Sequence, residues 1–222
     1  EILVHYLSTR NNNIKDSFLK ILFQGLPKDG GLYLPNTWPS IAIEDLEKKT
    51  YQEIAHIIIN PFVSNDIPKD KLKTVINETY ECFDHSEIAP LVNLEKNKYI
   101  LELFYGPTYA FKDYAMQFLG KLFSAVLENS KKNITVLGAT SGDTGSAAIN
   151  AFKGNDDIRV FILHPYGMVS EVQRRQMTTV EEKNVHNIAV KGTFDDCQKI
   201  VKKLFLENEL QLKTSLTAVN SI

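Results

Sequence analysis

The stretch ITVLGATSGDTGSAAINAF, residues 134–152, decides the fold class of this chain. It begins with a continuous apolar run, ITVLGA (134–139), passes through a turn rich in Gly, Ser and Thr, and continues into a helix expected at 142–153. An apolar strand without polar alternation is typical of a sheet that is covered on both faces. The order strand, turn, helix is typical of a βαβ unit.

The residues around this stretch repeat the same order. Further strands are expected at 159–163, 185–190 and 216–219, and further helices at 113–127, 170–178 and 194–206. Strands that alternate with helices of this length predict an α/β fold, with a parallel sheet and flanking helices.

The first part of the chain shows a different pattern. Residues 1–90 are expected to form a small, mostly helical module, with helices at 16–24, 44–59 and 69–83 and short strands at 2–7 and 31–35. The polar, Pro-containing stretch 84–94 is the predicted boundary, so the second domain is expected over 91–222. One more strand is expected at 99–104.

Composition excludes several classes of protein. Lys and Arg number 25 against 27 Asp and Glu, so there is no basic excess of the kind that nucleic-acid binding needs. No apolar run approaches the length of a membrane-spanning helix, and no signal peptide is visible at the N-terminus. Cys82 and Cys197 lie far apart, which favours a cytoplasmic setting, and the spacing of the five histidines indicates no metal site. The chain begins with Glu1 and ends on an apolar run, which is typical of a fragment of a longer protein.

A candidate binding loop follows the first strand of the sheet. GATSGDTG (138–145) opens a helix, so it presents unpaired backbone N–H groups and the positive end of the helix dipole to a small anion such as a carboxylate. Hydroxyl groups of Thr140, Ser141 and Thr144 add donors. The loop is not a P-loop, because Asp143 stands where that motif needs a lysine. An ordinary capped turn is the alternative reading of the same residues.

A candidate catalytic amine stands at the start of the helix expected at 113–127. Lys112 lies in YAFKDY (109–114), and a helix N-terminus disfavours the charged form of an amine. Phe111 and Tyr114 add desolvation, which acts in the same direction. A neutral amine is what Schiff-base chemistry uses. On this residue alone, a solvated surface lysine is the better-supported alternative.

Taken together, four stretches resemble the threonine synthases, pyridoxal phosphate enzymes of the tryptophan synthase β-like fold. The stretches are QGLPKDGGLYLP (24–35), LELFYGPTYAFKD (101–113), ATSGDTGSAA (139–148) and GTFDDCQ (192–198). The resemblance implies that residues 1–90 are the N-terminal module of that family and that residues 91–222 are the first part of its cofactor-binding region. By the same resemblance, the chain is the N-terminal half only.

The resemblance also implies roles for individual residues. Lys112 is expected to be catalytic and to form the Schiff base (aldimine) with pyridoxal 5'-phosphate, and Phe111 and Asp143 are expected to contact the cofactor, Asp143 beside its phenolic oxygen. Six residues are expected to contact the substrate, O-phospho-L-homoserine: Thr140, Ser141 and Gly142 at its α-carboxylate, and Thr144, Asn220 and Ser221 near its phosphate.

The activity implied is conversion of O-phospho-L-homoserine and water to L-threonine and phosphate. Two alternatives stay open: an O-phosphohomoserine phospho-lyase of the same fold, and an inactive truncated fragment without bound cofactor. Tyr105 stands where the family commonly has histidine, and no glycine cluster follows Gly192. The groups that contact the cofactor phosphate and the pyridine nitrogen are therefore expected beyond residue 222.

Overall fold

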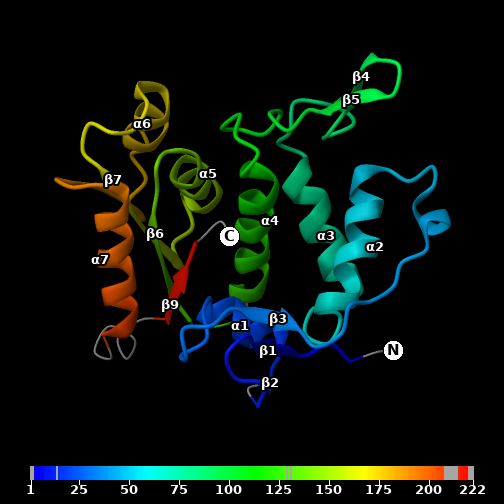
Figure 1. The fold of residues 1–222 in the computed structure, drawn as a ribbon, viewed down its shortest axis with the longest axis horizontal. Coiled ribbons are helices and arrows are strands. Elements are labelled where there is room, and N and C mark those ends of the chain that lie inside the picture. The colour runs from blue at the N-terminus through cyan, green and yellow to red at the C-terminus, as the bar shows by residue number, and fades with distance from the viewer. Residues whose placement is uncertain (1–2, 14, 129, 131, 208–214, 220–222) are drawn as a thin grey trace. The chain divides into compact units, whose positions relative to one another are not determined.

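The computed structural model describes residues 3–13, 15–128, 130, 132–207 and 215–219 (Figure 1). The chain divides into two compact units, Glu1–Tyr105 and Gly106–Ile222, and each is described by itself. This division follows compactness alone, so the domain boundary predicted near residue 90 stays a prediction.

The strands of the first unit form two small antiparallel sheets. A three-stranded sheet has the order β2-β1-β3, and a separate two-stranded sheet is the hairpin β4-β5. Their bounds are β1 Tyr6–Ser8, β2 Lys15–Asp16, β3 Tyr33–Pro35, β4 Leu91–Glu95 and β5 Lys98–Leu101. The strand expected at 99–104 is therefore the second arm of a hairpin and lies outside the parallel sheet.

The helices of the first unit are α1 (Phe18–Gln24), η1 (Ile43–Leu46, a single 3₁₀ turn), α2 (Tyr51–Val63) and α3 (Lys69–Tyr80). The helix expected at 44–59 was placed wrongly, because α2 begins after Thr50 and runs through Pro61. The start is set by a capping box, in which the Thr50 hydroxyl accepts from the Glu53 N–H and the Glu53 carboxylate accepts from the Thr50 N–H. Leu72, Val75 and Ile76 form the buried face of α3, at the spacing of one helix side.

The second unit is built on a four-stranded parallel sheet of order β8-β7-β6-β9 (Figure 1). Its strands are β6 (Ile134–Ala139), β7 (Ile158–Pro165), β8 (Val185–Val190) and β9 (Ser215–Ala218). Its helices are α4 (Asp113–Leu127), α5 (Asp143–Phe152), α6 (Glu171–Thr178) and α7 (Phe194–Leu206). The predicted α/β fold with a parallel sheet and flanking helices is confirmed.

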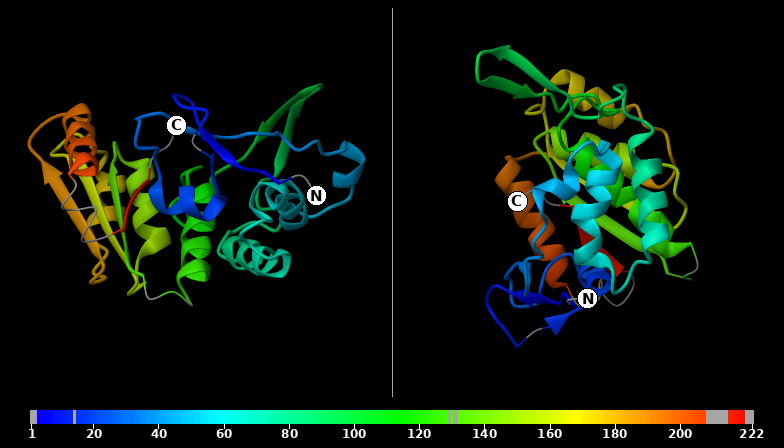
Figure 2. Two further views of the ribbon diagram at one scale, coloured as in Figure 1. Left: turned by 90° about the horizontal axis from the view of Figure 1, so that it is seen from below. Right: turned by 90° about the vertical axis from the view of Figure 1, so that its right-hand side faces the viewer.

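Helices cover both faces of this sheet (Figure 2). On one face, α7 packs its buried Cys197 against Leu137 and Leu163. On the other face, α5 approaches so closely that a Cβ on Gly145 would lie 2.9 Å from Cγ2 of Ile162. Because alternate residues of a strand point to opposite faces, apolar side chains of β6 and β7 lie on both faces of the sheet, as the continuous runs predict.

Among the described residues, no helix combines the length and the apolar character that crossing a bilayer requires.

Candidate functional site

The two segments predicted to carry chemistry begin helices that run in the same direction. Two contacts between α4 and α5 show this. Gln117 donates a hydrogen bond of 3.0 Å to Asn150, and further along both helices the ring centroids of Phe123 and Phe152 lie 6.1 Å apart. Later residues of α4 therefore meet later residues of α5. Since α5 follows β6, both helices begin toward the carboxyl ends of the strands (Figure 1). This edge is where ligands bind in open α/β sheets.

The loop that leads to Lys112 is organised by one buried carboxylate. Asp113 has no exposed surface, and its side chain accepts from the Thr108 N–H at 2.8 Å and from the Thr108 hydroxyl at 2.7 Å. A Cβ on Gly106 would lie 2.4 Å from Cβ of Asp113, so only glycine lets the carboxylate reach this position. Burial raises the pKa of Asp113, and the hydrogen bonds from the loop oppose that rise.

Lys112 lies where this loop becomes helix. It is the N-cap residue of α4 and half-buried, and its Nζ lies 4.5 Å from the centre of the Phe111 ring. The ring itself is 54% exposed, so the amine stands beside an accessible aromatic face. Tyr109 precedes them with φ +61°, a left-handed conformation that turns the chain sharply before the helix. Phe111 and Lys112, the two residues predicted as cofactor contacts in this segment, therefore lie together.

The second segment is held by the Thr140 hydroxyl. Its Oγ1 accepts from the N–H of Gly142 at 2.9 Å and from the N–H of Gly145 at 2.8 Å. Thr140 itself is only 2% exposed. The backbone N–H of Thr140 donates to the Leu163 carbonyl at 2.9 Å, which ties the loop to the end of β7. Thr140 thus fixes the loop from within, whereas Ser141 beside it is exposed.

Gly142 and Asp143 are joined to the following helix. Gly142 has φ +144°, a conformation that side chains rarely adopt, and a Cβ there would lie 2.1 Å from Oε1 of Gln173. The Asp143 carboxylate accepts a hydrogen bond from the Gln173 amide. Gly142, the N-cap residue of α5, has no capping side chain, but the Thr140 hydroxyl accepts from the Gly145 N–H in the first turn of the helix. The alternative reading as an ordinary capped turn therefore stays a prediction.

A feature that sequence reasoning missed is the role of α6. Gln173 donates to Asp143 at the start of α5, and Gln176 donates through Nε2 to the Thr108 carbonyl at 2.9 Å. Residues three apart lie on one helix face, so a single face of α6 contacts both predicted segments. The spacing of two glutamines after the Ser170 cap was the available signal. The neighbouring Arg174 and Arg175 pair with Glu171 on the surface.

The remaining predicted residues are placed less fully. Thr144 is half-buried in the first turn of α5, next to Asp143. Asn220 and Ser221 lie outside the described residues, so their predicted contact with a substrate phosphate stays a prediction.

The chemistry of this edge suits an aldehyde cofactor and a carboxylate substrate. A half-buried primary amine beside an aromatic face can form an imine with an aldehyde. The start of α5, with the exposed Ser141 hydroxyl in front of it, provides donors for a carboxylate. In the part of the chain that the structure describes, no group of three or more His, Cys, Asp or Glu side chains is placed to hold a metal ion.

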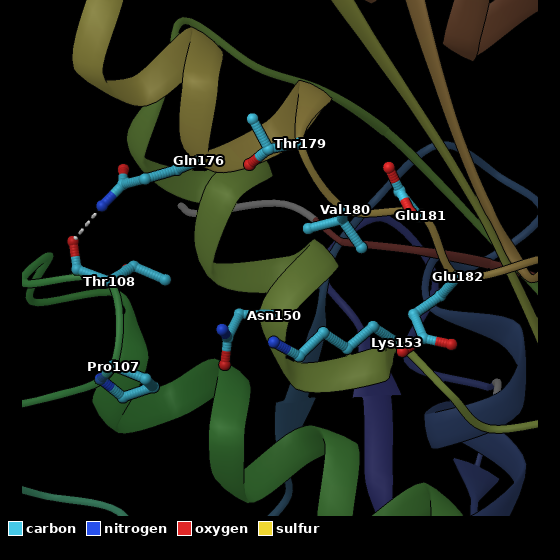
Figure 3. A pocket seen from close by; sticks show the side chains of 9 residues that line it. All are labelled: Pro107, Thr108, Asn150, Lys153, Gln176, Thr179, Val180, Glu181 and Glu182. Carbon is cyan, nitrogen blue, oxygen red and sulfur yellow. Dashed lines mark hydrogen bonds between the residues drawn. The ribbon is translucent and has the colours of Figure 1, made fainter.

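A separate cavity of about 380 Å³ opens nearby in the second unit (Figure 3). Its wall comes from the loop before α4, from α5 and from the end of α6, and it contains the Gln176–Thr108 hydrogen bond. Lys153, Glu181 and Glu182 also line it, so its lining is largely polar. None of the predicted site residues lines this cavity, and it carries no part of the functional assignment.

Comparison with known proteins gives consistent matches. Residues 5–80 match the sequence model of a family described as threonine synthase N terminus. Over 222 residues the chain is 46% identical to the threonine synthase of Pseudomonas aeruginosa. A crystal structure of threonine synthase from Brucella melitensis with bound pyridoxal phosphate (PLP) superimposes with a TM-score of 0.90 at 44% identity. The yeast threonine synthase structure superimposes with a TM-score of 0.86 at 45% identity.

These matches cover nearly all of this chain and about half of each relative. The shares are 99% of this chain and 47% of the Pseudomonas protein, 99% and 48% for the Brucella structure, and 98% and 46% for the yeast structure.

Proposed function

Because this chain corresponds to the N-terminal half of the threonine synthase family, we propose that the full-length protein converts O-phospho-L-homoserine and water to L-threonine and phosphate, with pyridoxal 5'-phosphate as its cofactor. It is then a lyase of threonine biosynthesis. The observation that carries the proposal is the placement of Lys112 at the start of α4, beside the Phe111 ring, at the edge of the sheet where the loop before α5 also lies.

Lys112 is the residue proposed to hold the cofactor, through a Schiff base to its aldehyde. When bound, the cofactor supplies an electron sink for the bond from substrate Cα to its hydrogen. With cofactor and substrate bound, the Lys112 amine would take the proton from Cα and would return a proton at a neighbouring carbon. The exposed Phe111 ring supports this role because it offers an apolar, planar surface at the amine.

The loop before α5 is proposed to orient the substrate. Other N–H groups at the start of α5, together with the Ser141 hydroxyl, are proposed to bind the α-carboxylate, which would fix the direction of the Cα–H bond relative to Lys112. Thr140 serves this loop indirectly, since its buried hydroxyl holds the N–H groups of Gly142 and Gly145. Asp143 is proposed beside the cofactor, where the amide of Gln173 fixes its carboxylate.

Further parts of the proposal rest on the resemblance. The groups that bind the cofactor phosphate and face the pyridine nitrogen are proposed to follow residue 222. A cytoplasmic location is proposed as well, supported by the wide separation of Cys82 and Cys197 in the sequence.

The test is an assay of the full-length protein in which threonine and phosphate are measured separately. Release of both in equal amounts supports the proposal, whereas phosphate without threonine identifies the phospho-lyase. Borohydride reduction of the cofactor-loaded protein should attach the cofactor to the peptide that contains Lys112. Lys112→Ala should abolish turnover, and Lys153→Ala, which removes an exposed lysine at the end of α5, should not.

The alternative of an inactive fragment is tested on residues 1–222 by an absorbance scan with added cofactor. A visible band that survives dialysis shows that this part alone holds the cofactor. Its absence, together with a band in the full-length protein, shows that the second half is needed.

A further inference from the structure

The cavity at the end of α5 has a lining that the proposed reaction does not use. It lies within the second unit, between the loop at Pro107 and Thr108, the last turns of α5 and residues 176–182 (Figure 3). Its volume of about 380 Å³ is in the range of cavities that hold small molecules. A ligand bound here would leave the proposed active site free.

Two hydrogen-bond donors on α5 face this cavity. Oδ1 of Asn150 accepts from Gln117 at 3.0 Å, which turns the other end of the amide, Nδ2, toward the cavity (Figure 3). Lys153 follows three residues later, so it lies on the same side of the helix, and its side chain extends along the cavity wall toward Asn150 (Figure 3). Among the residues that the structure describes, neither Nδ2 of Asn150 nor Nζ of Lys153 has a hydrogen bond or an ion pair. A cation beside an N–H donor is a suitable site for a carboxylate.

Two carboxylates lie at the opposite side of the same cavity. Glu181 and Glu182 follow Val180 in the segment after α6, and both are exposed at the rim. A ligand with only negative charge would be attracted by Lys153 and repelled by both glutamates, and a ligand with only positive charge would meet the reverse. A small molecule that carries both charges interacts favourably with both sides.

We propose that this cavity binds a free amino acid in its zwitterionic form. Its carboxylate would accept from Nζ of Lys153 and Nδ2 of Asn150, and its ammonium group would lie toward Glu181 and Glu182. The apolar surface of Val180 is available to its side chain. This inference uses the lining of the cavity alone and does not depend on the proposed reaction.

The wall that the cavity shares with the loop before α4 gives such binding a consequence. Thr108 is 7% exposed, and its carbonyl accepts from Gln176 within the cavity wall. The N–H and the hydroxyl of the same residue donate to Asp113, which directly follows Lys112. An amino acid in the cavity would therefore contact one side of the loop that leads to the proposed catalytic lysine and would restrict its motion. The cavity is in this sense a regulatory site.

Acetylation of lysines in the full-length protein, followed by mass spectrometry, tests the binding. L-Serine carries both charges, glycerate carries only the carboxylate and L-serinamide carries only the ammonium group. At saturation, L-serine should slow the acetylation of Lys153 at least about threefold relative to Lys202, an exposed lysine of α7, and the two singly charged compounds should do so much less.

Three results would overturn the proposal. Absence of protection by L-serine would mean that the cavity does not bind an amino acid. Equal protection by glycerate would identify a site for simple anions. Acetylation of Lys153 that is already more than about tenfold slower than that of Lys202 without any ligand would mean that the rest of the full-length protein closes the cavity.

Variants locate the site and test its link to the loop. Asn150→Asp keeps an acceptor for Gln117 and replaces the N–H that faces the cavity by a negatively charged oxygen, so protection of Lys153 by L-serine should be lost. Asn12→Asp makes the same change of charge on an exposed turn of the first unit and should keep the protection. L-Serine should also slow hydrogen exchange of the peptide 106–112 in the wild type and not in Asn150→Asp.

Protection that persists in Asn150→Asp would contradict the assigned site, and unchanged exchange of 106–112 in the wild type would contradict the regulatory role. All of these measurements are made without turnover, so failure here is distinguishable from failure of the proposed function.

Discussion

Replacement of Asp113 by alanine should loosen the loop before Lys112, whereas replacement by asparagine should not. The wild-type carboxylate is fully buried and accepts from both the N–H and the hydroxyl of Thr108. Alanine leaves the N–H without an acceptor in a site that excludes water. Asparagine keeps an oxygen for the N–H, and its amide can donate to the Thr108 hydroxyl oxygen once the hydroxyl rotates.

The expected magnitudes follow from these two hydrogen bonds. A hydrogen bond to a charged group contributes about 1.5–3 kcal/mol, and leaving a buried donor unpaired costs about 1–3 kcal/mol. Because the same atoms enter both figures, we expect a loss of about 3 kcal/mol for Asp113→Ala rather than their sum. For Asp113→Asn we expect about 1 kcal/mol or less, since burial already raises the pKa of the wild-type carboxyl and so disfavours its charged form.

Hydrogen exchange of the peptide 106–112 measures this difference locally. A loss of about 3 kcal/mol speeds exchange on the order of a hundredfold in Asp113→Ala, and Asp113→Asn should remain within about tenfold of wild type. Urea denaturation of the same variants should show the same order. Equal exchange in both variants would refute the reasoning, because it would mean that the carboxylate does not hold the loop through Thr108.

Three further predictions concern other parts of the chain. Thr140→Ala should lower the free energy of unfolding by about 1–3 kcal/mol, measured in urea, because two backbone N–H groups lose their acceptor. Thr140→Ser should have a free energy of unfolding close to that of the wild type. Ser141→Ala should weaken substrate binding without loss of stability. Burial raises the pKa of Tyr6 from 10.0 to about 12, so the neutral phenol's contribution to stability is complete below pH 10 and is lost as the pH rises toward 12. Tyr6→Phe should remove the part of the alkaline loss of stability that comes from Tyr6. A melting profile at alkaline pH that does not change in this variant would contradict the prediction. Gly145→Ala should destabilise the protein by about 1–3 kcal/mol, since the new Cβ would lie 2.4 Å from Cγ2 of Thr140. Gly138→Ala should cost less, because the nearest atom to its new Cβ lies at 3.3 Å. Equal Tm values for the two variants would contradict this order.

The parallel sheet could be predicted from the sequence because its signals are local. The run at 134–139 is mostly apolar, the run at 185–190 has apolar residues at both ends, and the strands begin and end at those residues. The helices at 113–127 and 194–206 also have the predicted bounds. Each element carries its own periodicity and end signals, so no tertiary information was needed.

The first unit was harder to predict because its elements depend on caps and pairing. The helix expected from 44 begins only at Tyr51, where the capping box with Thr50 sets the start. Glu44 looked like helix because its neighbours have suitable periodicity, yet it lies in a 3₁₀ turn. The hairpin β4-β5 depends on pairing across a turn at Asn97, with φ +64°, which composition does not reveal.

In the candidate site, too, local features could be predicted from the sequence and tertiary contacts could not. Lys112 and the loop before α5 could be found from sequence because each lies at the start of a helix, a local feature. The link between them through Gln173 and Gln176 was missed, because the spacing of two glutamines does not show which segments α6 contacts in the folded chain. Asp113 belongs to the stretch LELFYGPTYAFKD (101–113), but its role depends on the return of the loop to Thr108, which the sequence does not show.

The strand order β8-β7-β6-β9 has a consequence for how the chain is made on the ribosome. The last strand, β9, pairs beside β6, although β7 and β8 are synthesised between them. Until Ser215–Ala218 have emerged, one edge of β6 has no partner from this sheet, and an open strand edge is where nascent chains associate wrongly. The strand that leads into the proposed substrate loop, β6, therefore gains its second neighbouring strand only late in synthesis. Translation pauses before residue 215 should increase aggregation more than pauses after residue 218.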